Sequence, residues 1–398
     1  MADRQLSSPP IYFILMFPSG VSGGFLSVTL PFMFTQAGVP VATTAAIVAI
    51  GNSAMVWRFM WAPPVDLLLS THAWYAIGLV AASATVLLVA LVPTGPSLFL
   101  TSLVFVSQVA ATVTILPLAG MIAHTIEEEK KGGASGWYQA GSLAGVGIGG
   151  GAGVWLVTHS SSATAGASLA ALMLVCVLAL RFVPNVKPVG GSGIGERWRT
   201  LGREFVVMIR SPTSLLIMAL CASPIGVGAA AQLWSAVAPD WRATPGTIVL
   251  ATGLLSGVFS AIGCVLGGWA CDRFERFWTF FGGGAVVATV AIVLAELPRT
   301  PSIYAGGVLT YAVATGLAYS AYTAIIFYAI GAWAASAKYA IVGSLGNVPV
   351  AYMTFTDGWA HDRWGATGML YWEGVLGFAA IGLGLIALWR VNRFQKAA

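Results

Sequence analysis

Residues Trp57–Asp66 read Trp-Arg-Phe-Met-Trp-Ala-Pro-Pro-Val-Asp and close a long apolar run. They hold the first charged residues after Arg4, and one of these, Arg58, lies inside the apolar run rather than after it. Residues Gly267–Arg276, Gly-Gly-Trp-Ala-Cys-Asp-Arg-Phe-Glu-Arg, close another apolar run and also carry an aspartate. We interpret the two stretches as the same joint in two halves of a membrane protein, with a cation only in the first.

The composition points to a chain whose solvent is lipid. Of 398 residues, 58% are hydrophobic and 8% are charged, whereas soluble domains have about 25% charged residues. The net charge of +5 does not indicate nucleic acid, because the basic residues lie in short loops between apolar runs. The four cysteines lie in or at the ends of apolar runs without metal-ligand spacing. We expect no cofactor, no metal and no nucleic-acid partner.

Twelve apolar segments are each near the roughly 20 residues that cross a bilayer. The predicted spans are 11–36, 41–62, 73–92, 96–124, 133–158, 163–183, 213–236, 245–271, 277–297, 301–330, 338–360 and 367–390. With a cytoplasmic N-terminus, fifteen lysines and arginines fall in the cytoplasmic loops and termini and three outside. By the positive-inside rule, we expect a multi-pass protein of the inner membrane with both termini cytoplasmic.

The longest linker divides the chain into three parts. We predict an N-terminal six-helix bundle over residues 1–183, a cytoplasmic linker over 184–212 and a C-terminal six-helix bundle over 213–398. The end of the linker, residues 196–210, has the pattern of a basic amphipathic helix and is expected to lie on the anionic inner leaflet.

Two landmarks repeat at nearly the same offset. Asp66 and Asp272 are separated by 206 residues, and Gly141–Gly145 resembles Gly343–Asn347 at an offset of 202. The pattern indicates a duplicated six-helix unit, and hence an all-α membrane protein built from two six-helix bundles.

The two joints resemble motifs of the major facilitator superfamily. Gly268–Arg276 is similar to its signature Gly-x-x-x-Asp-Arg/Lys-x-Gly-Arg/Lys and departs from it at Glu275. Arg58–Asp66 resembles Lys-Phe-Leu-Trp-Ala-Pro-Leu-x-Asp, typical of a branch with muropeptide permeases, acetyl-coenzyme A transporters and single-subunit siderophore importers. The resemblance implies the major facilitator fold, with twelve transmembrane helices, and secondary transport of a small molecule by alternating access.

Arg58 has two readings. A cation inside a membrane segment costs several kcal/mol unless it is paired, snorkels or faces water. Its counterpart at the 206 offset is Cys264, so the charge belongs to the first half alone. Arg58 is therefore a candidate clamp for a carboxylate or phosphate of the substrate. Alternatively it snorkels to the cytoplasmic face, which is near in sequence.

Asp66 and Asp272 are candidates for a gate on the cytoplasmic side. A carboxylate at a helix end can pair with Arg273 or Arg276, or with the positive N-terminus of a neighbouring helix. The resemblance implies the same role. The alternative is a solvated loop charge without a role.

The resemblance also implies that segments one, four, seven and ten line a central cavity. Substrate contacts there are expected from polar and aromatic side chains: Gln108, Gln232, Trp234, Tyr311, Tyr319 and Tyr322. The tyrosines recur at helical spacing and would share one face. Helix packing or a place in an interfacial belt is the alternative for these side chains. Asn347 is a further substrate candidate, although an amide within a span more often bonds to another helix.

Coupling to protons needs a group that changes charge. Glu373 and Asp357 are the candidates, and both are predicted near the outer ends of their spans. Facilitated diffusion or exchange stays open as the alternative.

The leading hypothesis is import of an anionic or amphiphilic organic solute, such as a muropeptide, acyl-coenzyme A or siderophore, by a monomeric transporter. An exporter or facilitative exchanger is an alternative. A membrane-embedded transferase is an alternative of another class, but it needs a cluster of His, Asp or Glu at one face. The four histidines are scattered, so we expect no enzyme.

Overall fold

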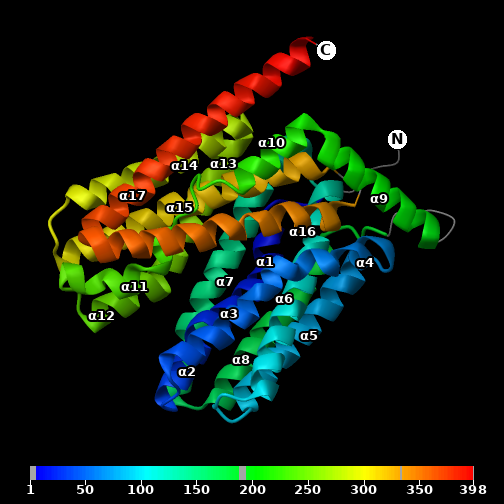
Figure 1. Ribbon diagram of the computed structural model, residues 1–398. Helices are drawn as coiled ribbons and strands as arrows, with labels where there is room; N and C mark the ends of the chain where they lie inside the picture. The colour runs from blue at the N-terminus through cyan, green and yellow to red at the C-terminus, as the bar shows by residue number, and fades with distance from the viewer. Residues whose placement is uncertain (1–5, 188–193, 332–333, 398) are drawn as a thin grey trace. The chain divides into compact units, whose positions relative to one another are not determined.

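The computed structural model describes residues 6–187, 194–331 and 334–397, and every regular element in these ranges is a helix (Figure 1). The cytoplasmic N-terminus predicted from sequence lies outside the described residues, as do positions 188–193 of the linker. The chain divides into two compact units. Unit 1 comprises Met1–Glu127, Trp137–Trp198 and Ile330–Ser344, and unit 2 comprises Glu128–Gly136, Arg199–Ala329 and Leu345–Ala398. A short stretch from each half of the sequence thus packs with the other half.

Unit 1 contains most of the first half of the sequence. Its elements are α1 (Ile11–Gly24), the π-helix η1 (Phe25–Thr29), α2 (Leu30–Gln36), α3 (Val41–Trp57), η2 (Arg58–Met60), α4 (Ala62–Leu67), α5 (Thr71–Leu91), α6 (Leu98–Thr125), most of α7 (Lys131–His159), α8 (Ser162–Val175), η4 (Cys176–Phe182) and α16 (Ala335–Leu345). Serine side chains cap the N-termini of several of these helices. The hydroxyl of Ser70 accepts from the N–H of Ala73 at the start of α5, and that of Ser97 from the N–H of Leu100 at the start of α6.

Unit 2 contains most of the second half. Its elements are η3 (Glu128–Lys130), most of α9 (Ile194–Arg210), α10 (Pro212–Cys221), η5 (Ala229–Gln232), α11 (Trp234–Val237), η6 (Ala238–Trp241), α12 (Pro245–Ile248), the π-helix η7 (Val249–Leu255), α13 (Ser256–Arg273), α14 (Arg276–Glu296), α15 (Pro301–Ile330) and α17 (Asn347–Ala397). The predicted amphipathic helix of the linker is present as α9, with Trp198 and Val206 exposed.

Nine helices of the described ranges are long and apolar enough to cross a membrane, and a tenth arises if a pair of helices bent by 80° around Ser211 is one span. Twelve spans were predicted, and three local features explain the difference. The helix α3 has 17 residues, the seventh segment is broken after Cys221, and the last two segments run on as Ala335–Val391. The chain is thus an all-helical, multi-span membrane protein.

The break in the seventh segment is made by glycine. Between α10 and η5, both Gly226 and Gly228 have a φ of +66°, in the left-handed region that favours glycine. A Cβ on Gly228 would also overlap the side chain of Thr315. The predicted span 213–236 is therefore a helix, an irregular stretch and two short helical elements, η5 and α11.

The last two spans form a hairpin without a loop. Within α17, Gly365 has φ +68° and ψ −171°, and the ribbon reverses its direction along this element (Figure 1). The turn that was predicted over residues 361–366 is thus reduced to one glycine. Both helices are longer than predicted on this side.

Candidate functional site

Asp66 binds the beginning of a helix from the other half of the sequence. Its Oδ1 accepts from the N–H of Ser336 at 3.2 Å, and its Oδ2 from the N–H of Ala337 at 2.9 Å. These are first-turn N–H groups of α16, which have no partner within the helix, and the helix dipole favours an anion there. Burial raises the pKa of the Asp66 carboxyl above its usual value, and the two N–H groups oppose this shift.

Asp272 makes the equivalent contact in unit 2. Its Oδ2 accepts from the N–H of Gly133 at 2.8 Å, in the first turn of α7. A Cβ on Gly132 would come within 2.5 Å of the other carboxylate oxygen, so glycine lets the helix end approach. Of the two partners considered for these aspartates, the structure has the helix N-terminus rather than an arginine.

The arginines of the second joint have other partners. Arg276 donates to the Oε1 of Glu128 at 2.9 Å and to its carbonyl oxygen at 2.5 Å, and Lys131 pairs with the Oε2 of Glu128 at 2.6 Å. Arg273 lies over the ring of Trp269. Sequence reasoning missed Glu128, although the charged run Glu127–Lys131 before the fifth segment was a signal for it.

Glu275 replaces the glycine of the family signature and has a local function. Its carboxylate accepts from the N–H groups of Phe277 and Trp278 at 3.3 and 3.2 Å. It therefore caps the N-terminus of α14.

Arg58 is buried, with 6% of its surface exposed. Its Nε donates to the Oγ of Ser344 at 3.4 Å, and its guanidinium carbon lies 5.1 Å from the ring centroid of Tyr339. A Cβ on Gly343 would overlap a guanidinium nitrogen. No carboxylate in the described part of the chain forms an ion pair with Arg58. In the described part of the chain, the guanidinium of Arg58 thus contacts one hydroxyl and one aromatic ring.

The expected cavity residues differ in their surroundings. Gln108 is buried and donates to the Oγ of Ser22 at 3.1 Å, which joins α6 to α1. Gln232 is exposed at the end of η5. Trp234 is buried in an aromatic cluster, with its ring 5.4 Å from that of Tyr311. Asn347 is half-buried at the start of α17. Their contact with substrate stays a prediction.

The tyrosines of α15 form hydrogen bonds to the broken seventh segment and to α17. The hydroxyl of Tyr304 donates to the carbonyl of Trp234 at 2.9 Å, and that of Tyr319 to the carbonyl of Val227 at 3.0 Å. The hydroxyl of Tyr311 donates to Glu373 at 2.5 Å. The hydroxyl of Tyr322 lies where a Cβ on Gly346 would be. The shared face predicted for this row is present, and it packs within unit 2.

Glu373 and Asp357 lie on the two helices that meet at Gly365 in α17. They are eight residues after and eight residues before the turn at Gly365. At about 1.5 Å per residue, both lie about 12 Å from the turn, which brings them to the same level of the hairpin. Asp357 is fully buried and Glu373 is 5% exposed. The two helices are longer here than predicted because the connecting loop is a single glycine, and the position of the two carboxyl groups near the outer ends stays a prediction.

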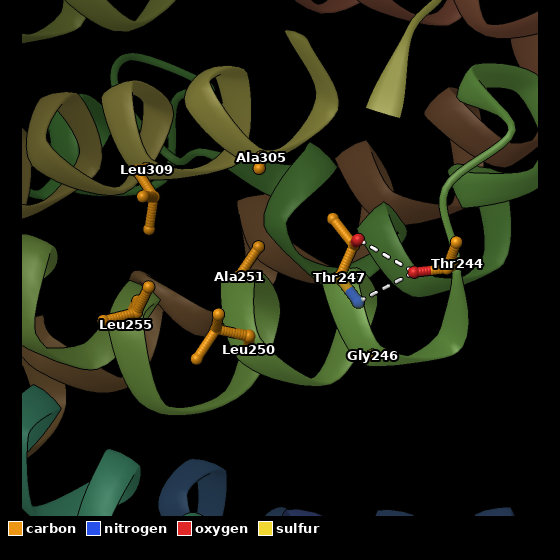
Figure 2. A pocket seen from close by; sticks show the side chains of 8 residues that line it. All are labelled: Thr244, Gly246, Thr247, Leu250, Ala251, Leu255, Ala305 and Leu309. Carbon is orange, nitrogen blue, oxygen red and sulfur yellow. Dashed lines mark hydrogen bonds between the residues drawn. The ribbon is translucent and has the colours of Figure 1, made fainter. Parts of the chain in front are cut away.

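Unit 2 also contains a half-open cavity of about 380 Å³. Figure 2 shows its wall, formed by α12 and η7 on one side and by Ala305 and Leu309 of α15 on the other. Only Thr244 and Thr247 bring hydroxyls to it, and these bond to each other at 2.9 Å. None of the residues predicted to bind substrate is part of this wall.

Comparison with known proteins agrees with this architecture. A family model described as Major Facilitator Superfamily matches residues 12–352. The crystal structure of the human organic anion transporter MFSD10 (TETRAN) superposes with a TM-score of 0.70 and 12% identity, over 94% of this chain and 98% of that chain. A search of curated proteins finds no match. Because the family model covers most of its length, the chain belongs to the Major Facilitator Superfamily, and it is a secondary transporter of small molecules and not an enzyme.

Proposed function

We propose that this transporter carries an organic anion, and that Arg58 binds the negative charge. The observation behind this proposal is a buried arginine without a carboxylate partner in the described ranges. Burying an unpaired guanidinium costs several kcal/mol. A cost of this kind is usual where the charge has a function. The superposed human protein is itself an organic anion transporter, which agrees with this choice, although that likeness extends only to the fold.

The burial of Arg58 argues against the snorkelling alternative. A snorkelling arginine keeps its guanidinium in water, whereas the side chain of Arg58 is covered by Tyr339 and Ser344 of α16. We infer that α16 takes the place of the anion in this conformation. When α16 moves away, Arg58 loses these contacts, and a substrate carboxylate or phosphate replaces them with a bidentate pair.

Asp66 and Asp272 are the gating residues in this proposal, assisted by Arg276 and Arg273. Each aspartate joins one half of the sequence to a helix that begins in the other half. In alternating access one half moves against the other. The two helix N-termini would therefore have to leave their carboxylates when the protein opens on this side.

The first joint narrows the class of substrate. Its resemblance to the motif of muropeptide, acetyl-coenzyme A and siderophore transporters favours an amphiphilic anion. We propose import across the inner membrane, with both termini and both aspartates on the cytoplasmic side. The excess of lysine and arginine in the loops of that side supports this orientation.

The proposal is tested by ligand binding to purified Arg58 variants. Full-length protein in detergent is screened by thermal shift against acetyl-coenzyme A, a muropeptide and a ferric siderophore. For an anion that stabilises the natural protein, Arg58→Ala is expected to weaken binding about tenfold to a hundredfold, because a hydrogen bond to a charged group is worth about 1.5–3 kcal/mol. Arg58→Lys is expected to restore little of this, because lysine cannot form the bidentate pair.

Arg363→Ala is the matched control. Arg363 also stacks on an aromatic ring, that of Trp359 at 4.2 Å, but it is exposed. The Arg363→Ala protein should bind each anion with the affinity of the natural protein. Uptake into proteoliposomes then tests transport of the same ligand. Equal affinity and rate in natural protein, Arg58→Ala and Arg58→Lys would refute the clamp.

A further inference from the structure

The hairpin α17 buries two carboxyl groups that lack sufficient donors. The Oε1 of Glu373 accepts from the hydroxyl of Tyr311 at 2.5 Å and from the N–H of Ala230 at 3.4 Å. The Oε2 of Glu373 and both oxygens of Asp357 have no hydrogen-bond partner in the described part of the chain. The two groups are close enough to interact electrostatically. Three buried carboxyl oxygens at one level of the hairpin, one of Glu373 and two of Asp357, thus lack a donor or a positive charge among the described residues.

The surrounding elements supply no cation. The titratable side chains that face the pair are Tyr311 and Tyr319 of α15. The neighbouring α10 and η5 contain no charged residue, and α14 has charges only at its ends, Arg276 and Glu296. No lysine, arginine or histidine of the described ranges pairs with Asp357 or Glu373.

Two carboxylates cannot stay ionised together in such a place. Like charges in an apolar site repel each other, and each also loses its hydration. A single positive charge removes most of this cost. We propose that Asp357 and Glu373 form one site for a single monovalent cation, H⁺ or Na⁺. The inference rests on the proposed transport function in one respect: in a secondary transporter this cation would be the coupling ion.

The site is connected to the broken seventh segment. Glu373 accepts from Ala230, just after the break, and Val227 and Ala229 pack with Met353 and Leu376 of α17. These two residues are one helical turn from Asp357 and Glu373 respectively. In other transporters, unwound helix segments coordinate coupling ions through backbone carbonyls. Loss of the cation would leave a second negative charge beside this segment and change its position.

The test measures cation binding without any organic substrate. Thermal unfolding of the purified full-length protein is followed while NaCl replaces choline chloride at constant ionic strength and pH. Infrared spectra without sodium are then recorded over a range of pH, because a protonated carboxyl has a C=O stretch that a carboxylate lacks. The variants are Asp357→Asn and Glu373→Gln. Asp362→Asn is the control, since it is an exposed aspartate of the same hairpin.

The sodium titration identifies a sodium site, and the infrared titration identifies a proton site. For a sodium site, the unfolding temperature rises with sodium and saturates, and both variants bind sodium at least about tenfold more weakly. For a proton site, sodium has no such effect, and a carboxylic C=O band titrates with pH and is lost in Asp357→Asn or Glu373→Gln. Asp362→Asn keeps the natural response in both arms.

The proposal is overturned if the natural protein has neither a saturable response to sodium nor a carboxylic band that these variants remove. The same result in Asp362→Asn as in the two variants would also overturn it. The outcome is independent of the anion site, because Arg58→Ala should keep the cation response even where it loses the anion. A failed clamp and a failed cation site are therefore distinguishable.

Discussion

Gly145→Val is expected to leave little folded protein in the membrane. Five glycines, Gly20, Gly24, Gly141, Gly145 and Gly149, line the crossing of α1 and α7, and a Cβ on any of them would overlap a backbone carbonyl of the opposite helix. At Gly145 the overlap is with the carbonyl of Phe17, and the Cα of Gly20 and the nitrogen of Val21 would be 2.9 Å away. The neighbouring atoms are backbone, so no rotamer change relieves the clash.

The size of the effect follows from this rigidity. Overpacking a core costs about 1–3 kcal/mol and more where the backbone must move. A valine would force the two helices apart along the whole crossing, in a membrane where close packing of small residues is the main source of helix association. We therefore expect a loss of at least about 3 kcal/mol out of a total stability of about 5–15 kcal/mol.

The measurement is the yield of monodisperse protein after solubilisation, followed by thermal unfolding of what remains. Gly282→Val is the control, because Gly282 of α14 is exposed and a Cβ there would meet nothing within 4 Å. It brings the same side chain into another membrane helix. Equal yield and unfolding temperature for Gly145→Val and Gly282→Val would mean that the crossing does not depend on close approach.

The sequence was sufficient to predict where the apolar spans lie, because a hydrophobic run of about 20 residues without charges is best satisfied as a membrane-spanning helix. It was not sufficient where the chain departs from a straight helix. The break after Cys221 depends on carbonyls that Tyr304 and Tyr319 of another helix satisfy. The turn at Gly365 has no run of loop residues. A lone glycine in an apolar run is ordinary in membrane helices, so the turn at Gly365 was not visible in advance. The break after Cys221 did have a signal, because Pro224, Gly226 and Gly228 follow one another closely there.

The same limit applies to the candidate site. Asp66 and Asp272 stood out because they end apolar runs at corresponding places. Their partners are backbone N–H groups, which no residue type marks in a sequence. Asp357 and Glu373 were recognised as titratable, but their common level depends on the position of the turn. Sequence patterns indicated which residues carry charge, whereas packing decides what each charge meets.

Asp66→Ala and Asp272→Ala are each expected to shift the gate strongly towards its open form. Asp66 accepts two N–H bonds from the first turn of α16, and Asp272 accepts at least one from α7. A hydrogen bond to a charged acceptor is worth about 1.5–3 kcal/mol, and the helix dipole adds about 0.3–1 kcal/mol. Loss of two such bonds changes the equilibrium by about a hundredfold or more, since 1.4 kcal/mol is a factor of ten.

The shift is measured by labelling a cysteine placed at Ser336, beside Asp66, with a membrane-impermeant thiol reagent in inside-out vesicles. This is done in a chain whose four natural cysteines, all of them buried, are replaced by serine. Asp66→Ala should raise the labelling rate and abolish net transport, because the closed form is no longer reached.

Asp66→Asn separates the effect of the charge from that of the side-chain shape. Its amide oxygen can still accept one N–H bond but has no charge for the helix dipole, so its labelling rate should be intermediate. Asp362→Asn should behave as the natural protein. Unchanged labelling in Asp66→Ala would mean that α16 is held by its other contacts, and that the aspartate is only a helix cap.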